Sequence, residues 1–192
     1  MAGDPLYPAC RPRCVRQMAV GDGHILHVEE CGPLDGLPVL FLHDGPGHGC
    51  QPEHSRLFDP RRFRVICIDQ RGAGHSLPSG ELGANTTPDL VVDFEHVRDA
   101  LGISNWIVFG GGWGSLLAVA YSQLFTERVL GMVLCGIFLG SRQEVEAGLR
   151  EQSAEEHRVG AKPRPQIVRR LQHLQHCASG LHHRRWDAIA EQ

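Results

Sequence analysis

The chain has 192 residues, of which 42% are hydrophobic and 21% charged, and its formal net charge is −3. This composition is typical of a globular domain, and it excludes the concentrated basic surface that sequence-independent nucleic-acid binding requires. No apolar run approaches the roughly 20 residues of a membrane-spanning helix, and residues 1–20 lack the apolar stretch of a signal peptide. With seven cysteines, an odd number that fits reduced thiols, we expect a soluble, cytoplasmic protein that binds neither nucleic acid nor membrane.

Short apolar runs alternate with helical patterns along the chain, which is typical of a sheet whose strands are joined by crossover helices. The segment His24–Glu30 alternates polar and apolar side chains and predicts a half-exposed strand. Continuous apolar runs predict four strands that are covered on both faces, as in parallel sheets: Val39–Leu42, Phe63–Ile68, Trp106–Phe109 and Val129–Leu134. The pattern therefore predicts an α/β fold with a mostly parallel sheet.

Two segments between these runs carry helix signals. Thr87, Pro88 and Asp89 predict an N-cap, a first helical residue and an acidic first turn. Apolar residues then recur at helical spacing until Gly102 ends the helix. A second helix is predicted from about Gly114 to Phe125. Both are expected to be crossover helices in right-handed βαβ units.

The character of the sequence changes near residue 143. Residues 143–192 are polar, with helical spacing but no further strand–loop–helix unit, so we divide the chain into part of an α/β core (1–142) and a helical tail (143–192). The tail contains five histidines: His157, His173, His176, His182 and His183. They show neither H-x-x-x-H nor H-E-x-x-H spacing. The sequence therefore predicts no metal site and no cofactor.

Three glycine-rich segments each follow a predicted strand: 43–47, 69–76 and 110–114. In parallel α/β sheets the binding crevice lies at the carboxyl ends of the strands. Three such segments in succession therefore indicate one site rather than three unrelated turns. The third segment is not a dinucleotide-binding loop, because Ser115 stands where the third glycine belongs.

In this order the segments resemble three motifs of the proline iminopeptidase family, H-G-G-P-G, D-Q-R-G-x-G-x-S and G-G-x-W-G. The triplet 85–87 before a helix, Pro5–Pro8, the turn 21–24 and the segment 136–139 add to the resemblance, which covers roughly residues 6–142. The resemblance implies an α/β-hydrolase fold, here truncated after about six strands. It also implies a serine peptidase that releases N-terminal proline from peptides and needs no metal.

The nucleophile of such an enzyme stands on a sharp strand-to-helix turn, and small residues two positions to either side permit the strained backbone. Gly110 and Gly114 are those small residues, and Gly111 lies between Gly110 and the nucleophile position. That position holds Gly112, which has no hydroxyl. Ser115 lies in the first helical turn and is expected to point away from the turn.

The resemblance also implies two backbone N–H groups that stabilise an oxyanion. One belongs to Trp113, and the other to Gly45 or Asp44 in the loop that begins at His43. Asp44 replaces the family's glycine, and its carboxylate would oppose the developing negative charge. His75 stands where the family has Arg or Lys, and we interpret it as a histidine on a surface loop.

The Asp and His of the catalytic triad follow late strands in this fold, and neither is identifiable, since Asp187 follows the tail histidines in the wrong chain order. Two interpretations stay open. The chain is either an inactive relative of proline iminopeptidase or a non-catalytic binding or regulatory protein on a hydrolase scaffold. If the sheet ends at Val129–Leu134, that apolar edge favours self-association.

Overall fold

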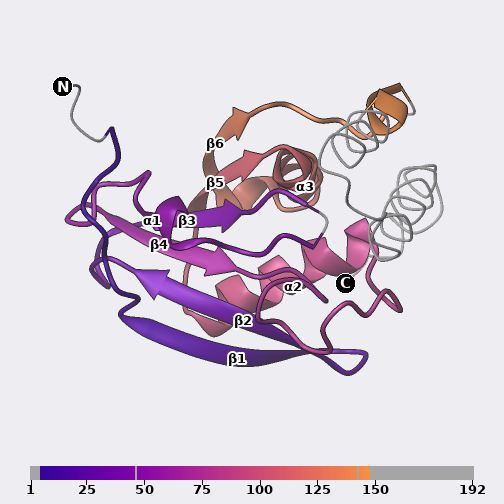
Figure 1. Ribbon diagram of the computed structural model, residues 1–192. Coiled ribbons are helices and arrows are strands. Elements are labelled where there is room, and N and C mark those ends of the chain that lie inside the picture. The colour runs from indigo at the N-terminus through magenta and orange to yellow at the C-terminus, as the bar shows by residue number, and fades with distance from the viewer. Residues whose placement is uncertain (1–4, 46, 142, 148–192) are drawn as a thin grey trace, which may run out of the picture.

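The computed structural model describes residues 5–45, 47–141 and 143–147, and its centre is a six-stranded sheet in the order β1-β2-β4-β3-β5-β6 (Figure 1). The elements in chain order are β1 (Cys14–Gly21), β2 (His24–Cys31), β3 (Leu37–Leu42), α1 (Pro52–Ser55), β4 (Phe63–Ile68), α2 (Thr87–Ala100), β5 (Trp106–Gly111), α3 (Trp113–Leu124), a 3-10 turn (Thr126–Arg128) and β6 (Val129–Cys135). Residues 143–147 are also helical. None of the described helices has the length and apolar character that crossing a bilayer would require.

The sheet is parallel through its centre and antiparallel at one end. Strand β3 pairs in parallel with β4 and β5, and β5 pairs in parallel with β6. Strand β2 pairs antiparallel with β1 and with β4. This mostly parallel sheet, with α2 and α3 in its connections, confirms the predicted α/β-hydrolase fold.

All five predicted strands are present as β2 to β6. The alternation in β2 is confirmed, because His24, Leu26, Val28 and Glu30 are buried and the side chains between them are partly exposed. The pattern did not single out β1. Most of the β1 side chains are exposed, and the strand has a neighbour on one side only, so no apolar run marks it.

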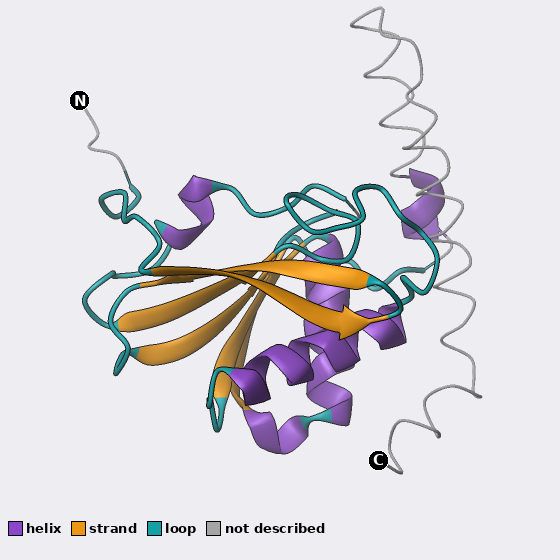
Figure 2. Ribbon diagram, turned by 90° about the horizontal axis from the view of Figure 1, so that it is seen from below, coloured by secondary structure: helices purple, strands orange, loops and turns teal. Residues whose placement is uncertain are grey.

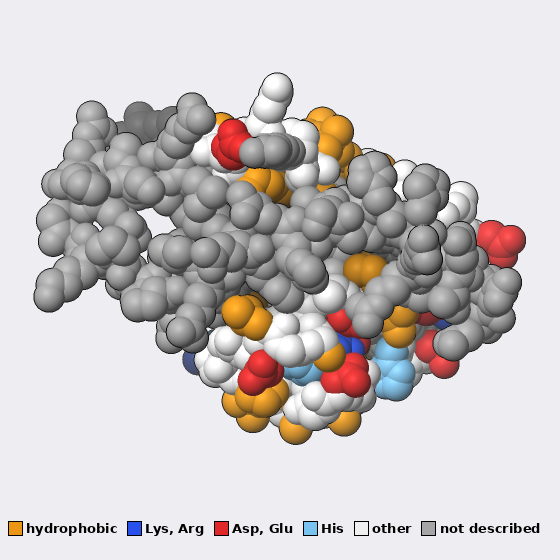
Figure 3. Space-filling model, turned by 90° about the vertical axis from the view of Figure 1, so that its right-hand side faces the viewer, with side chains coloured by type: hydrophobic (Ala, Val, Ile, Leu, Met, Phe, Trp, Pro, Cys, Tyr) orange, Lys and Arg blue, Asp and Glu red, His pale blue; other side chains and the backbone are white. Residues whose placement is uncertain are grey.

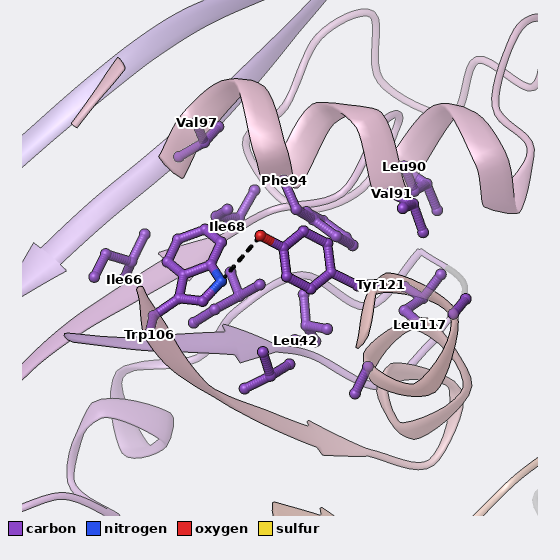
Figure 4. Packing of buried hydrophobic residues seen from close by; sticks show 14 of the residues in the cluster. Leu42, Ile66, Ile68, Leu90, Val91, Phe94, Val97, Trp106, Leu117 and Tyr121 are labelled. Atoms are coloured by element: carbon purple, nitrogen blue, oxygen red, sulfur yellow. Dashed lines mark hydrogen bonds between the residues drawn. The ribbon is translucent and has the colours of Figure 1, made fainter. Parts of the chain in front are cut away.

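Helices α2 and α3 cover one face of the sheet, and the short α1 lies against the other (Figure 2). On the α2–α3 side, Phe94 and Tyr121 pack near Trp106, whose indole N–H donates to the Tyr121 hydroxyl at 3.2 Å (Figure 4). A smaller cluster on the opposite face includes Phe41 and Phe58. The central strands are therefore buried on both faces, as their continuous apolar runs predict.

The start of α2 differs from the prediction by one residue. Thr86, not Thr87, is the N-cap, and its backbone N–H and hydroxyl donate to Asp89 Oδ2 at 2.8 and 2.6 Å. A carboxylate at the third helical position reaches back to the N-cap backbone. The hydrogen bonds to Asp89 therefore make Thr86 the N-cap. Pro88 is then the second helical residue rather than the first.

Strand β6 is the last strand of the sheet within the described ranges, and it pairs with β5 alone. Its side chains Leu130, Met132 and Val133 are exposed. An apolar edge was predicted for this strand, and the described residues have one. The boundary near residue 142 and the histidines of the tail fall on residues outside the described ranges.

Candidate functional site

The turn between β5 and α3 is centred on Gly112. Strand β5 ends at Gly111 and α3 begins at Trp113, while Gly112 is the N-cap with φ 52° and ψ −120°. This positive φ is costly for a residue that carries a Cβ. The Gly112 N–H donates to the Cys135 carbonyl oxygen at 3.0 Å, which ties the turn to the end of β6. The predicted nucleophile position thus lies at a strand-to-helix turn.

The backbones around this turn approach too closely for side chains at two positions. A Cβ on Gly110 would lie 2.2 Å from the Gly114 carbonyl oxygen, and one on Gly114 would lie 2.2 Å from the Leu42 carbonyl oxygen. Gly111 differs, because the nearest atom to its Cβ would be the Cys135 carbonyl oxygen at 3.7 Å. The turn therefore requires glycine at 110 and 114, but the space around Gly111 admits a side chain.

The carboxylate of Asp44 joins the loop after β3 to the start of α3. Its Oδ1 accepts hydrogen bonds from the backbone N–H of Gly45 at 2.8 Å and from that of Trp113 at 2.7 Å. These N–H groups are among the oxyanion donors that the resemblance implies. Both N–H groups donate to Asp44 Oδ1, an oxygen atom of the protein itself rather than of a substrate.

The Asp44 carboxylate occupies the space in which a side chain at position 112 would lie. A Cβ on Gly112 would lie 2.2 Å from Asp44 Oδ1 and 2.5 Å from its Cγ, so a side chain at 112 and the observed Asp44 carboxylate exclude each other. Gly112 has no side chain with which to cap α3. Asp44 performs that task from another loop, because it accepts from the first helical N–H, where negative charge is favourable.

His43 is buried behind this loop and uses both ring nitrogens. Its Nδ1 donates to the Asp44 carbonyl oxygen at 2.6 Å, and its Nε2 accepts from the Gln70 backbone N–H at 3.1 Å. Burial lowers the pKa of His43 to about 4, against the opposing hydrogen bond to Asp44, so the ring is neutral at pH 7. Both nitrogens are engaged, and His43 therefore positions the loop and is not placed to act as a general base.

Gln70 connects three parts of the site, and the sequence analysis did not single it out. Its Nε2 donates to the His43 carbonyl oxygen at 2.9 Å, and its Oε1 accepts from the Trp113 indole N–H at 3.1 Å. The available signal was its place, since it follows β4 in the glycine-rich segment 69–76. Gln70 links the loop after β3 to the Trp113 ring of α3.

Ser115 does not face the turn. Its side chain is buried, and its hydroxyl donates to the Gly112 carbonyl oxygen at 2.7 Å and accepts from the Phe138 N–H at 2.9 Å. Both contacts are to backbone groups. Ser115 therefore ties the segment after β6 to the turn, and its hydroxyl does not take the place of the missing serine.

The face toward which β3 and β4 point carries acidic and histidine side chains next to apolar ones (Figure 3). His75 belongs to the loop after β4, and its side chain is 76% exposed, as expected of a surface-loop histidine. The tail histidines and Asp187 lie outside the described residues.

Comparisons with known proteins agree with the motifs. A proline iminopeptidase of Xylella fastidiosa is 49% identical over 141 residues, which are 73% of this chain and 45% of that protein. The proline iminopeptidase of Arabidopsis thaliana is also 49% identical over 141 residues, 73% of this chain and 37% of that protein. The chain thus spans less than half the length of these curated relatives.

Among solved structures, a proline iminopeptidase-related protein from Thermus thermophilus is similar, with a TM-score of 0.57 and 31% identity over 65% of this chain and 44% of that one. The resemblance to proline iminopeptidases is confirmed by these similarities. Residues 38–164, more than half of the chain, match the family described as alpha/beta hydrolase fold. They include the loop after β3, the end of β4 and the β5–α3 turn, and the chain therefore belongs to the α/β-hydrolase family.

Proposed function

We propose that this chain is a proline iminopeptidase-like α/β-hydrolase that has no hydrolytic activity. One observation carries the proposal: the N–H groups of Gly45 and Trp113 bind the Asp44 carboxylate, in space that exists because Gly112 has no side chain. The turn thus offers neither a nucleophile nor a vacant pair of oxyanion donors.

Acyl transfer by a serine peptidase needs both of these features. The hydroxyl attacks the carbonyl carbon, and the carbonyl oxygen becomes an oxyanion that N–H donors stabilise at about 2.7–3.1 Å. Loss of the nucleophile alone lowers turnover about a millionfold, and the remainder comes from the oxyanion hole and from binding. Here the Asp44 carboxylate already binds the N–H of Trp113 and that of Gly45. Its negative charge opposes that residual catalysis as well.

The substrate class follows from the relatives, which are named proline iminopeptidases. By this resemblance the parent reaction releases an N-terminal proline from a peptide. The triad Asp and His, and the acidic groups that hold the substrate's amine, belong to the part of the family beyond the match. Cleavage is therefore the reaction of the longer relatives, and we expect this chain to lack it.

A second candidate function is non-catalytic peptide binding. It is favoured by the hydrogen bonds of Gln70 with His43 and Trp113, which keep the base of the site ordered beside a position without a nucleophile. Titration with a prolyl dipeptide, followed by tryptophan fluorescence, tests it. A saturable change that Trp113→Phe abolishes supports binding at this site, and a flat titration at millimolar peptide excludes it.

The test of the main proposal is hydrolysis of a proline arylamide by the purified 192-residue chain, with a full-length proline iminopeptidase as the positive control. We expect no rate above that of buffer. Gly112→Ser and the double variant Gly112→Ser/Asp44→Gly should also be inactive, since no described residue is placed as a base to activate the new hydroxyl. Wild-type turnover that a serine-directed reagent abolishes would refute the proposal.

A further inference from the structure

The geometry points to a divalent metal site formed by His27, Asp69 and His75, with Zn²⁺ as the ion whose ligand preferences it fits. One ligand atom from each residue lies within 4.8 Å of the other two. The site is independent of the chemistry proposed at Gly112, and its test measures metal binding rather than hydrolysis. It also departs from the sequence analysis, which predicted no metal site.

Strand pairing brings the first two residues together. Val28 of β2 lies opposite Ile68 of β4 in an antiparallel register, so His27 and Asp69 are the next pair along. The Asp69 backbone N–H donates to the His27 carbonyl oxygen at 2.9 Å. Because side chains opposite each other in a sheet share a face, the imidazole and the carboxylate lie side by side.

The loop after β4 places His75 beside Asp69 and His27. The His75 N–H donates to Asp69 Oδ2 at 2.8 Å, and the hydroxyl of Ser76 donates to the Asp69 carbonyl oxygen at 2.6 Å. Ser76 Oγ also accepts from the His27 N–H at 2.9 Å. The loop is thus tied to both partners, and the two imidazole rings have centroids 4.9 Å apart.

Two imidazoles and one carboxylate form the ligand set of many sites in which Zn²⁺ keeps a water molecule as its fourth ligand. Ligands of a tetrahedral zinc ion lie about 3.3 Å apart, given bonds of about 2.0–2.1 Å. His75 Nδ1 already lies 3.4 Å from Asp69 Oδ2, and its side chain is 76% exposed. Because the His75 ring is exposed, it is free to turn toward an ion that His27 and Asp69 contact, without movement of the strands.

Asp69 has the capacity for a metal bond. The side chain is 1% exposed, and its Oδ1 accepts from the Cys50 N–H at 2.6 Å while Oδ2 accepts from His75. An ionised carboxylate offers about four lone-pair positions. The hydrogen bonds to the backbone hold the group in place and leave lone pairs for an ion.

The His27 ring contacts two further side chains, those of Glu29 and Gln17. The Glu29 carboxylate oxygen Oε1 lies 3.0 Å from His27 Nε2, and the Gln17 side-chain nitrogen lies 3.1 Å from Nδ1. Histidines that bind metals commonly donate their second N–H to a carboxylate, which orients the ring. One ring nitrogen of His27 lies within 4.8 Å of the Asp69 and His75 ligand atoms, and metal binding at that nitrogen would replace one of these two side-chain contacts.

By the resemblance of the segment 69–76 to the family motif, Arg or Lys usually stands where this chain has His75. A cation at that place would pair with Asp69 and would repel a metal ion. Replacement by a neutral imidazole removes the repulsion and adds a ligand. His75 is therefore the residue that creates the site in this chain.

The test is a calorimetric titration of the full chain with zinc chloride, in a reducing, non-chelating buffer, for wild type, His75→Arg, His27→Gln and the control His96→Ala. His96 lies exposed on α2, and every protein keeps the same cysteines and tail histidines. We expect one zinc equivalent to be lost, or weakened about 100-fold or more, in His75→Arg and His27→Gln only. Loss of a group that merely orients a ligand already weakens metal binding about 10–100-fold.

Cobalt substitution gives a second readout. Co²⁺ bound at this site should show visible d–d bands without an intense sulfur-to-cobalt charge-transfer band, and His75→Arg should remove those bands. Zinc titrations that are the same for wild type, His75→Arg and His96→Ala would overturn the proposal. So would a cobalt spectrum that shows only thiolate ligation. Because His75 is exposed, its replacement by the family's arginine is not expected to unfold the chain.

Discussion

At the scale of single residues, Asp44 and Gly112 act as a unit. The absent Cβ of Gly112 leaves the volume that the Asp44 carboxylate fills, and that carboxylate caps a helix whose N-cap residue has no side chain. Gly112 provides the space that the Asp44 carboxylate occupies, and Asp44 provides the helix cap that Gly112 lacks. A change at either position should therefore depend on which residue stands at the other.

Replacement of Gly112 by alanine should lower the free energy of unfolding by about 2–6 kcal/mol. The added Cβ would overlap Asp44 Oδ1, and the positive φ would strain the backbone; each effect typically costs about 1–3 kcal/mol. In the Asp44→Gly background the same change should cost about 1–3 kcal/mol less, because only the strain remains. Urea unfolding of the four proteins measures this coupling.

Gly111→Ala is the matched control for that cycle. Its Cβ would have 3.7 Å to the nearest atom, so it should cost less than about 1 kcal/mol in both backgrounds. Effects of Gly112→Ala and Asp44→Gly that add within about 0.5 kcal/mol would show that the two residues do not compete for space.

The buried ring of His43 should make stability depend on pH. Its pKa is lowered to about 4 in the folded chain from 6.5, so the unfolded state binds a proton first as the pH falls. The neutral ring's contribution is complete above about pH 6.5, declines as the pH falls, and is lost below about pH 4. Between pH 7 and pH 5 this amounts to about 2 kcal/mol.

Urea unfolding at pH 7 and pH 5 checks the expectation. His43→Asn should be less stable at pH 7, but its loss on acidification should be smaller by about 2 kcal/mol than that of wild type. His96→Ala, a change at an exposed histidine, should keep the wild-type pH dependence. An equal loss in wild type and His43→Asn would contradict the assignment.

At the scale of secondary structure, the site is formed by strand ends rather than by the loops alone. Asp44, Gln70 and Gly112 each lie within two residues of the end of β3, β4 or β5. Leu42, the last residue of β3, pairs with Ile68 of β4 and with Gly110 of β5. Since parallel strands end at one edge of the sheet, this register determines which loop residues meet.

The same sheet leaves β6 with one partner among the described strands, and this edge should promote self-association. Its exposed apolar side chains, together with unpaired backbone groups, favour pairing with another chain. We expect light scattering at micromolar concentration to show dimers or larger species. Leu130→Lys, at a side chain that is 58% exposed, should reduce them.

Val92→Lys is the matched control for the edge, because Val92 is an exposed apolar residue on α2. It adds the same charge away from β6 and should leave association unchanged. A wild-type chain that is monomeric, with a sharp and reversible unfolding transition, would show that the edge is covered.

At the scale of the whole molecule, the sequence predicted best the strands at the centre of the sheet. Phe63–Ile68 was predicted with the bounds that β4 has, and Trp106–Phe109 with the correct start of β5. Such strands must be apolar throughout, so their own residues reveal them. Strand β1 was missed because its exposed side chains follow from its position at the edge, which its own residues do not show.

Part of the candidate site was also predictable from the sequence, and part was not. Gly110 and Gly114 were predictable, because a tight strand-to-helix turn demands small residues there, and Gly112 was located by its place between them. The contact of the Asp44 carboxylate with Trp113 was not predictable, since it depends on the direction of one side chain. The meeting of His27 with His75 was also invisible, because it needs the antiparallel register of two strands distant in sequence.

The overlap of Asp44 with position 112 has an evolutionary consequence. Starting from this sequence, a serine gained at position 112 meets the Asp44 carboxylate, and a glycine gained at position 44 removes the acceptor of two N–H groups. We expect either single step to lower the free energy of unfolding. The two positions are therefore expected to change together: a side chain at position 112 favours loss of the Asp44 carboxylate, and retention of Asp44 favours glycine at position 112.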